Sequence, residues 1–429
     1  MPNIAVIGWD EENLALLREL PDDDYHFHGV LPADRIVGVE GLDMPALLEE
    51  AERRLEDIPG QVDAIVGYWD FPVSSLVPML CQRRGLPSAG LEAVVKCEHK
   101  YWSRLEQQKV ICEHPSFGVI DLDRPDEHVE LPEGLRFPVW VKPVKSASSE
   151  LAFHVQDQDE LDTAMAEIRA GAGKMGEPFE FVLAQVELPE EIASVGGTAA
   201  LVEESVGGAQ LTVEGYAHDG EVRVHGVIDS LTYPDSPSFR SYQYPSDLPQ
   251  AVQKRLVDNA TRVIGQIGLS PSAFNIEYFW DAETDRLALL EVNPRLSQSH
   301  AWLFEQVDGV ANHQVMVRLA LGRVPRMPHR EGPYAVAAKY FLRRFDDGVV
   351  TAGPSLEHVQ SVQRELDGVH VHVVATEGDR LSEQRQHDSY SFEVAQIHVA
   401  AAVREELEEK YRRCVQMLGY EIDGDPLRG

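Results

Sequence analysis

Length and composition indicate an acidic globular protein with several domains. The 429 residues, 43% of them hydrophobic, can bury a large core and should divide into roughly two to four domains. The 38 basic and 72 acidic residues give a formal net charge of −34, which argues against nucleic acid bound over a broad surface. No apolar run approaches the roughly eighteen residues of a membrane span, and MPNIAVIGWD lacks the basic start of a signal peptide. Cys81, Cys97, Cys112 and Cys414 have no CxxC spacing, so we expect reduced thiols in a cytoplasmic protein without a membrane partner.

The first 90 residues are predicted to form an α/β domain. Continuous apolar runs at 3–8 and 64–68 are typical of parallel strands covered on both faces, and helical patterns at 13–20 and 45–55 lie between them. Gly8 alone does not make a GxGxxG fingerprint, so no dinucleotide site is predicted. Substrate contacts are expected where the strands of such a domain end.

A turn-rich hinge, GLPSAG at 85–90, leads into a helical segment that carries Lys100. Further on, a strand from Phe137 ends at Lys142-Pro143, and a second strand begins at Leu151. The loop between them is rich in Ser and Ala, whose small side chains let backbone N–H groups approach phosphate oxygens. Lys142 lies among apolar residues of its strand, where a buried ammonium needs an anion.

The middle of the chain is predicted to alternate between a helix and a strand meander. A helix at 157–172 is followed by a linker, GAGKMGEP, which lacks P-loop spacing. A strand from 201 ends in Glu203-Glu204, and two glycines then turn the chain. TVEGYA and EVRVHGVI should pair through the Asp219-Gly220 turn. Residues 229–249 are expected to be a long loop before a helix at 250–267. Its Arg240, Tyr242 and Tyr244 are candidates for substrate contacts, with surface packing as the alternative.

Residues 273–300 carry the strongest chemical signal. The apolar runs 274–280 and 287–292 flank a polar segment and predict a β-hairpin. Folding it about Thr284 sets Glu277 opposite Glu291, and Asn293 follows on the same face. Cross-strand Cβ atoms lie about 5 Å apart, so two carboxylates there repel each other unless a cation lies between them. Oxygen ligands of this kind suit Mg²⁺, and Arg295 is placed to hold a phosphoryl group. The alternative is a solvated polar face of an edge hairpin.

The remainder shows no further chemistry. His300 precedes a predicted helix at 301–321 and is either a ligand for substrate or phosphate or a capping residue. Strands are expected at 336–342 and 369–374, and a final amphipathic helix, with a break or cap inside it, at about 391–418.

The string LLEVNPRLSQSHAWLFEQVDGV, with FNIEYFWD before it, resembles the closing motif of the ATP-grasp superfamily. The resemblance rests on Glu277, Glu291, Asn293, Pro294 and Arg295. It implies that the two glutamates and the asparagine hold Mg²⁺, with Mn²⁺ as the other candidate ion, against ATP. It further implies that Arg295 contacts the transferred phosphate, and it makes His300 a second catalytic candidate.

The same resemblance implies further nucleotide contacts. HKYWSR resembles the segment whose basic residue, here Lys100, reaches the phosphates, and KP resembles the strand end whose lysine, here Lys142, does the same. Lys145, Ser146 and Ser148 belong to the loop over the phosphates. The segment from Glu203 and Glu204 to Val206 matches the hinge whose backbone binds adenine. Gln210, and Glu214 on the same side of its strand, are the candidates for the ribose hydroxyls.

The resemblance also implies the architecture: α/β and α+β, an ATP-grasp fold with a pre-ATP-grasp domain at 1–90 and a C-terminal α+β lobe at 326–429. The ATP-grasp domain would cover 91–325, with a small lobe at about 135–205 and a large lobe at about 206–325. The C-terminal lobe resembles that of biotin-carboxylase-like members, and a homodimer is a further expectation.

The expected activity is that of an ATP-dependent ligase that activates a carboxylate as an acylphosphate and joins it to an amine. Both substrates would be small molecules, with amino acids as the leading class. A bicarbonate-activating carboxylase is the first alternative, but Ser299 stands where those enzymes carry a glutamate before the histidine. SQSH looks more like the corresponding run of carbamoyl-phosphate synthetase, although this chain has a single grasp unit. A nucleotide-binding protein without turnover is the second alternative.

Overall fold

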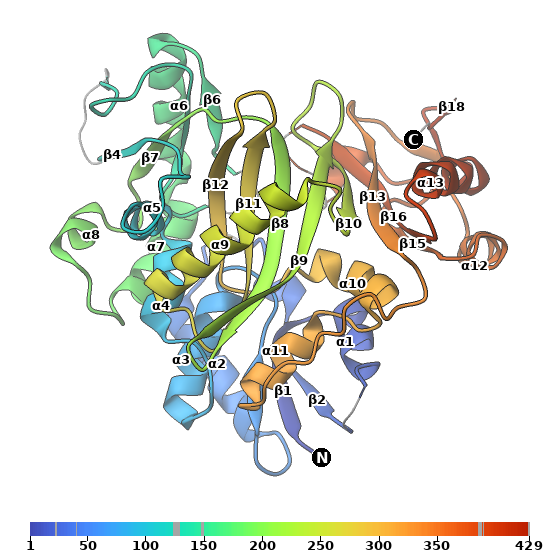
Figure 1. Cartoon of the computed structure of the whole chain (residues 1–429), viewed down its shortest axis with the longest axis horizontal. Coiled ribbons are helices and arrows are strands. Elements are labelled where there is room, and N and C mark those ends of the chain that lie inside the picture. The colour runs from blue at the N-terminus through green and yellow to red at the C-terminus, as the bar shows by residue number, and fades with distance from the viewer. Residues whose placement is uncertain are drawn as a thin grey trace.

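The computed structural model describes residues 1–21, 24–39, 41–122, 129–146, 150–384, 388 and 390–427. Figure 1 shows the N-terminal domain below, the small lobe at the upper left, and a large sheet that runs through the centre to the C-terminal part on the right. No helix in the described part of the chain is long and apolar enough to cross a bilayer.

The N-terminal domain alternates strands and helices, as predicted. It contains β1 (Asn3–Trp9), α1 (Glu11–Arg18), β2 (His26–Pro32), η1 (Ala33–Arg35), α2 (Met44–Glu56), β3 (Ala64–Val66) and α3 (Val73–Arg84). The strands are parallel in the order β2-β1-β3 and bury their apolar runs on both faces. Two further helices, α4 (Leu91–Glu98) and α5 (Lys100–Gln108), then carry the chain to the lobes.

The small lobe is an antiparallel sheet in the order β4-β7-β5-β6. Its elements are β4 (Phe117–Ile120), β5 (Val139–Pro143), β6 (Phe153–Val155), α6 (Gln158–Gly171), α7 (Gly173–Leu183), α8 (Glu190–Val195) and β7 (Ala200–Glu204). The lobe therefore begins with β4, before the expected start near residue 135. On β5, Val139 and Val141 point into the core under α6, whereas Lys142 points to the other face.

The large sheet contains, among the described residues, eight strands in the order β12-β11-β8-β9-β10-β13-β16-β15. The central elements are β8 (Ala209–His218), β9 (Glu221–Thr232), β10 (Phe239–Tyr244), α9 (Gln250–Ile267), β11 (Ser272–Asp281), β12 (Arg286–Asn293), η2 (Gln298–His300), α10 (Ala301–Asp308) and α11 (His313–Ala320). The apolar face of β8, β11 and β12 packs on α9, so the alternate residues of these strands face the small lobe and the N-terminal domain.

The C-terminal part continues this sheet and closes it with helices. It contains β13 (Val336–Arg344), β14 (Val350–Ala352), α12 (Leu356–Glu365), β15 (Val369–Val373), η3 (Leu381–Glu383), β16 (Phe392–Ala401), α13 (Glu405–Leu418), β17 (Glu421–Ile422) and β18 (Asp425–Pro426). β14, β17 and β18 form a small separate sheet. Because β13 pairs with β10, the expected boundary near residue 325 does not interrupt the hydrogen-bonded ladder.

Four segments differ from their predictions. Residues 171–178 are helical, not a linker, and Gly176 permits close packing because a Cβ there would lie 2.6 Å from the Gly197 carbonyl oxygen. The expected loop at 229–249 contains the end of β9 and all of β10. The expected helix at 301–321 is divided into α10 and α11 by Gly309, whose φ is +91°. The first part of the expected helix at 391–418 is β16, which pairs on both edges.

Candidate active site

The hairpin of β11 and β12 brings the two predicted metal ligands together. Glu277 pairs with Glu291, and Asn275 with Asn293, as expected for a fold about Thr284. Beyond this point the register shifts, because Tyr278 pairs with Leu289 and leaves Leu290 as an extra residue. Without this bulge Glu291 would share a face with Leu287 and Leu289, which are buried against α9. The bulge therefore turns Glu291 towards Glu277.

Electrostatics distinguish the two carboxylates. Burial, helped by the facing Glu291, raises the pKa of Glu277 to about 7. Burial also opposes ionisation of Glu291, but the Lys100 ammonium outweighs it and lowers the pKa of that carboxyl. Asn293 completes the group and donates its amide to Asn275 Oδ1 at 3.0 Å. Glu277 therefore keeps its proton up to about neutral pH while it faces the ionised Glu291. Such a pair of carboxylates is suited to a divalent cation, which would take the place of that proton.

Lys100 is not an exposed lysine of a helix surface. It begins α5, its side chain is 12% exposed, and its ammonium pairs with Glu291. Burial disfavours the charged form, but Glu291 outweighs burial and raises the pKa of Lys100. The cation next to the carboxylate pair is thus supplied by the helix between the two lobes.

Glu203 holds two cations of the small lobe and α5. Its carboxylate accepts from Arg104 Nε at 2.5 Å and pairs with Lys142 Nζ at 2.7 Å. Burial works against its charge, but Arg104 and then Lys142 lower the pKa of Glu203 to about 2. Arg104 also donates to the Leu289 carbonyl at 2.9 Å and the Leu290 carbonyl at 2.7 Å, which joins α5 to β12.

The connection between the lobes runs from Glu204 through the half-buried Val206 to β8. Arg286 donates to both oxygens of Glu204, at 2.7 and 2.9 Å, and these hydrogen bonds lower the pKa of Glu204 to about 2. Gly208 has a φ of +117°, and a Cβ there would lie 2.4 Å from the Trp280 carbonyl oxygen. This residue lets the connection cross the end of β11 closely.

Lys145 lies in a different place from the phosphate loop predicted for it. Its ammonium pairs with Glu98 and lies over the rings of Phe71 and Phe179, at 4.8 and 4.9 Å from the ring centroids. Only 3% of the side chain is exposed, so it links α4 to the small lobe and does not extend over a nucleotide. Ser146 is 9% exposed, and Ser148 lies outside the described residues.

Arg295 connects the large sheet to the N-terminal domain. Its Nε and Nη2 donate to the two carboxylate oxygens of Asp70 at 2.7 and 2.6 Å. Burial opposes both charges, but each partner outweighs it, which raises the pKa of Arg295 and lowers that of Asp70. Asp70 follows β3 and was not predicted as a site residue, although the rule that ligands gather at strand ends pointed to this loop.

His300 is held by Glu214. Its Nδ1 lies 2.7 Å from Glu214 Oε1, and its ring meets that of Tyr242 edge-on at 4.9 Å between centroids. Within the described residues His300 Nε2 has no hydrogen-bond partner. Glu214 also accepts from the Ser297 N–H at 3.2 Å and from Asn312 at 3.0 Å, and it is 0% exposed. It therefore fixes the segment 297–300, and with both carboxylate oxygens accepting from protein groups its geometry does not support the ribose role predicted for it.

Gln210 adjoins the carboxylate pair, and Tyr242 lies within reach of its charge. The Gln210 amide donates to Glu277 Oε2 at 3.0 Å, so this residue lies against the predicted metal ligands. Burial, and then the charge of Glu277, raise the pKa of Tyr242. The other two candidates from 229–249 point elsewhere, because Arg240 pairs with Glu408 at 2.6 Å and the Tyr244 hydroxyl donates to Asp308 at 2.8 Å.

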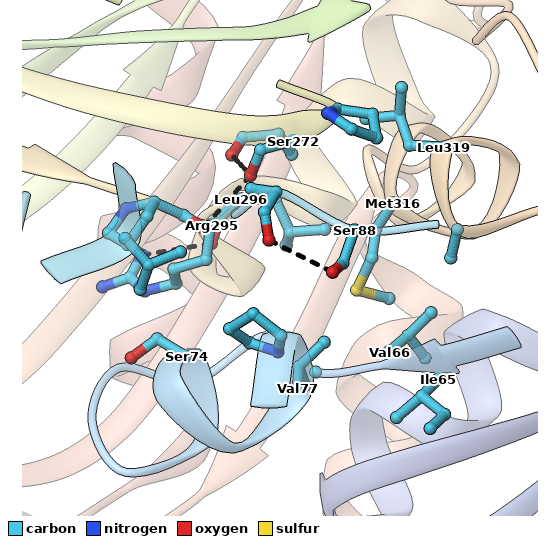
Figure 2. A pocket seen from close by; sticks show the side chains of 18 of the residues that line it. Ile65, Val66, Ser74, Val77, Ser88, Ser272, Arg295, Leu296, Met316 and Leu319 are labelled. Carbon is cyan, nitrogen blue, oxygen red and sulfur yellow. Dashed lines mark hydrogen bonds between the residues drawn. The ribbon is translucent and has the colours of Figure 1, made fainter. Parts of the chain in front are cut away.

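A cavity of about 80 Å³ lies beside Arg295, between the N-terminal domain and the large sheet. Figure 2 shows Arg295 and Ser74 on one side of it and Met316 and Leu319 on the other. Most of the lining is aliphatic, with Ser88 and Ser272 as further polar groups. Ser74 donates to Glu98 Oε1 at 2.5 Å, so the charged network of α4 reaches the edge of the cavity.

The small-lobe sheet and the large sheet, with Lys100 of α5 against the facing carboxylates of β11 and β12, form the two-lobed arrangement expected of an ATP-grasp domain. Residues 135–301 match the family model described as ATP-grasp domain, so the chain contains an ATP-grasp domain over that range. The predicted fold class is thereby confirmed.

Solved structures and a curated relative extend this comparison. The L-amino acid ligase from Bacillus licheniformis superposes with a TM-score of 0.70 at 16% identity, over 98% of each chain. An N5-carboxyaminoimidazole synthase from Aspergillus clavatus, solved with ADP and an aminoimidazole ribonucleotide, gives a TM-score of 0.67 at 13% identity, over 97% of this chain and 98% of that one. The carbamoyl phosphate synthase large chain of Thermotoga petrophila is 32% identical over 94 residues, which are 22% of this chain and 8% of its own length.

Proposed function

We propose that this protein is an ATP-dependent ligase that activates a carboxylate as an acylphosphate and joins it to an amine, releasing ADP and phosphate. The observation that carries the proposal is the facing, half-buried pair Glu277 and Glu291, with Lys100 on one side and Arg295 on the other. Acidic and basic groups arranged around one cleft are what a polyphosphate with a divalent cation requires.

The donor set fits Mg²⁺. Glu277 and Glu291 offer carboxylate oxygens from neighbouring strands, and Asn293 offers an amide oxygen on the same face. Within the described residues no third carboxylate, histidine or cysteine joins them, in keeping with an ion that fills its octahedron with water and phosphate oxygens. The ion, Mg²⁺ or in its place Mn²⁺, would neutralise charge on the phosphates.

ATP would occupy the cleft between the lobes. Lys142 lies on the face of β5 away from the small-lobe core, paired with Glu203, and Ser146 ends the described part of the loop that follows it. The backbone from Glu204 to Val206 would receive the adenine, and Gln210 would lie near the sugar and Glu277. Glu291 and the phosphate compete for the Lys100 ammonium. Once the cation is bound to Glu291, this ammonium would leave the carboxylate and pair with a phosphate oxygen.

Bond changes would take place near Arg295. An oxygen of the substrate carboxylate attacks the γ-phosphorus, the bond to the β-phosphate oxygen breaks, and ADP leaves. The amine then attacks the acyl carbon, and inorganic phosphate leaves with the bonding electrons. Arg295, held in place by Asp70, would bind the transferred phosphoryl group, and His300 Nε2 is free to accept the amine proton. The aliphatic cavity beside Arg295 supports a carboxylate substrate with a small apolar side chain.

The test is release of ADP and phosphate from the full chain with amino acids and other carboxylates, supplied singly and in pairs. Turnover only with a carboxylate and an amine together supports the ligase. Bicarbonate-dependent release without an amine would instead identify a carboxylase, and nucleotide binding without release under any condition would identify a protein that binds ATP without using it. The amide product is then identified by mass spectrometry.

A further inference from the structure

Lys339 is a buried cation without a counter-ion. It lies in the middle of β13 and is 6% exposed. Within the described residues no carboxylate lies within ion-pair distance of its ammonium, and its one polar contact is the Ser299 hydroxyl at 3.4 Å. A buried, unpaired ammonium costs several kcal/mol of folding free energy, so a protein keeps one where it serves another purpose.

The nearest acids are engaged elsewhere. Glu393 accepts from Arg343 at 3.3 Å and from Gln396 at 2.5 Å, and Glu12 lies 3.8 Å from His372. Burial lowers the pKa of Lys339, and these two acids only partly oppose it. An additional anion would therefore stabilise the charged form of this lysine.

The side chain lies on the same face of the sheet as the catalytic groups. Ala338, Tyr340 and Leu342 point into the C-terminal core, so Lys339 and Phe341 point to the other face. In the register, Lys339 pairs with Tyr242 on one side and His398 on the other. Tyr242 touches His300, and Ser299 adjoins it in the chain, so the ammonium borders the predicted catalytic histidine.

The surroundings fit the carboxylate of an organic molecule better than a phosphate. Aromatic rings form the walls: the Phe341 ring lies 5.3 Å from the ammonium, Tyr242 packs against Phe341 at 5.2 Å, and Trp302 packs against His398 at 5.2 Å. His398 is neutral, since burial lowers its pKa, and its Nδ1 has no partner within the described residues. One ammonium balances one negative charge, whereas bound phosphate groups usually meet more than one cation.

A carboxylate bound at Lys339 would lie at a different part of the sheet from the metal ligands, so it is not the group that would be phosphorylated. In the large sheet, β11 with Glu277 and β13 with Lys339 are separated by β8, β9 and β10. Four steps of about 4.8 Å separate the two strands by roughly 19 Å along the sheet, a span of the order of a phosphoryl group, an acyl group and an amino acid together. The second substrate, the amine, is the one that reaches this end of the cleft.

We infer that Lys339 binds the α-carboxylate of an amino acid that serves as the amine substrate, with the Ser299 hydroxyl and Tyr242 beside it. The inference rests on the proposed ligase function for the identity of the step, but the anion site itself is open to a separate test. A carboxylate site at Lys339 restricts the amine substrate to molecules that themselves carry a carboxylate group.

The experiment measures binding of each proteinogenic amino acid, and of the corresponding amino-acid amides, by thermal shift of the full chain with Mg²⁺ and a non-hydrolysable ATP analogue. Unmodified protein, Lys339→Met and Lys339→Arg are compared, with Lys254→Met as a control on the exposed face of α9. At least one amino acid should stabilise the unmodified protein while its amide does not. Lys339→Met should weaken that binding by at least about tenfold, as expected for a lost charge-assisted hydrogen bond, and Lys339→Arg should retain part of it.

A structural role for Lys339 predicts a different pattern. Removing an unpaired buried charge should leave the melting temperature of the ligand-free protein unchanged or raise it, whereas a supporting contact would lower it. Equal binding of amino acids and amides, no binding of either, or binding unaffected by Lys339→Met would overturn the anion site. Binding that depends on Lys339 without ADP release would support the anion site and contradict the ligase function. Turnover that Lys339→Met leaves unchanged would support the ligase function and contradict the anion site.

Discussion

Glu203 on β7 of the small lobe and Glu277 on β11 of the large sheet are both carboxylates removed from bulk water, and their ionisation differs widely. Glu203 is enclosed by Arg104 and Lys142, and its pKa is lowered to about 2 in spite of burial. Glu277 is buried beside a second carboxylate, and its pKa is raised to about 7. Arg104 and Lys142 therefore neutralise Glu203 within the protein. The carboxylates of the hairpin carry negative charge that a bound cation would neutralise.

This difference separates structural from functional acids without reference to any relative. Burial acts in the same direction on both groups, so the partners decide the result. At Glu203 two cations from different elements converge on one carboxylate, whereas at the hairpin Lys100 pairs with Glu291 and Glu277 accepts from the neutral Gln210 amide. A mutation at the first site should change stability, and one at the second should change chemistry.

The largest expected effect is on turnover. Glu291→Gln removes a carboxylate that would hold the cation, and ADP release should fall by roughly 100- to 1000-fold, the loss typical for a group that stabilises charge in the transition state. Circular dichroism should be unchanged, and the melting temperature should fall by less than in Glu203→Gln because the Glu291 side chain is 36% exposed. Glu283→Gln, in the exposed turn of the same hairpin, is the matched control and should retain full activity. Near-normal release by Glu291→Gln would remove this residue from the metal site.

The next effect is on stability. Glu203→Gln leaves Arg104 and Lys142 without their anion, and removal of one partner from a buried ion group typically costs about 3 kcal/mol. Urea denaturation should show a clear decrease in the transition midpoint. Glu277→Gln, a matched change on β11, should leave the midpoint unchanged or raise it. If both variants are destabilised alike, the distinction between the two carboxylates fails.

A pH series without metal sharpens the same comparison. The folded-state pKa of Glu277 is raised from 4.5 to about 7, so its contribution to stability is full below pH 4.5 and is lost as pH rises through 7. Glu203 acts in the opposite sense, with a contribution present above pH 4.5 and lost as pH falls towards 2. Melting temperatures in EDTA should reveal the first slope, and added Mg²⁺ or Glu277→Gln should flatten it. A slope that persists in Glu277→Gln must come from another group.

The smallest expected effect concerns the connection between the lobes. Arg286 and Glu204 are 46% and 34% exposed in their side chains, and ion pairs of this kind contribute about 0.2–1 kcal/mol. Arg286→Ala should therefore change the melting temperature little. Salt should weaken the difference between the variant and the unmodified protein, as screening requires. A destabilisation as large as that of Glu203→Gln would mean that the connection carries more of the fold than its exposure indicates.

The part of the candidate site that could be predicted consists of residues close to one another in the sequence. Glu277 and Glu291 lie on two adjacent strands, so one turn determines their pairing, and the residues alone were enough. The bulge at Leu290 was not visible, because the run LALL gives no sign of which residue is left unpaired. The turn prediction was right at the glutamates and shifted by one position beyond them.

Contacts between distant segments could not be read in this way. Asp70 and Arg295 belong to different domains, and Glu214 reaches His300 across the large sheet. The inward turn of Lys145 depends on aromatic residues from α7 and the loop before α3. The strands β10 and β16 were missed because proline- and serine-rich flanks resembled a loop in one case, and an adjoining helix extended the pattern in the other.

The pairing of β13 with β10 has a consequence for anyone who wishes to shorten or recombine this protein. A truncated protein that stops after α11 would leave the backbone donors and acceptors of one side of β10 open to solvent, and such an edge recruits other chains. The C-terminal third is thus no detachable module. Chimaeras designed to exchange specificity should carry all the strands of this sheet together, or their yield will be limited by aggregation.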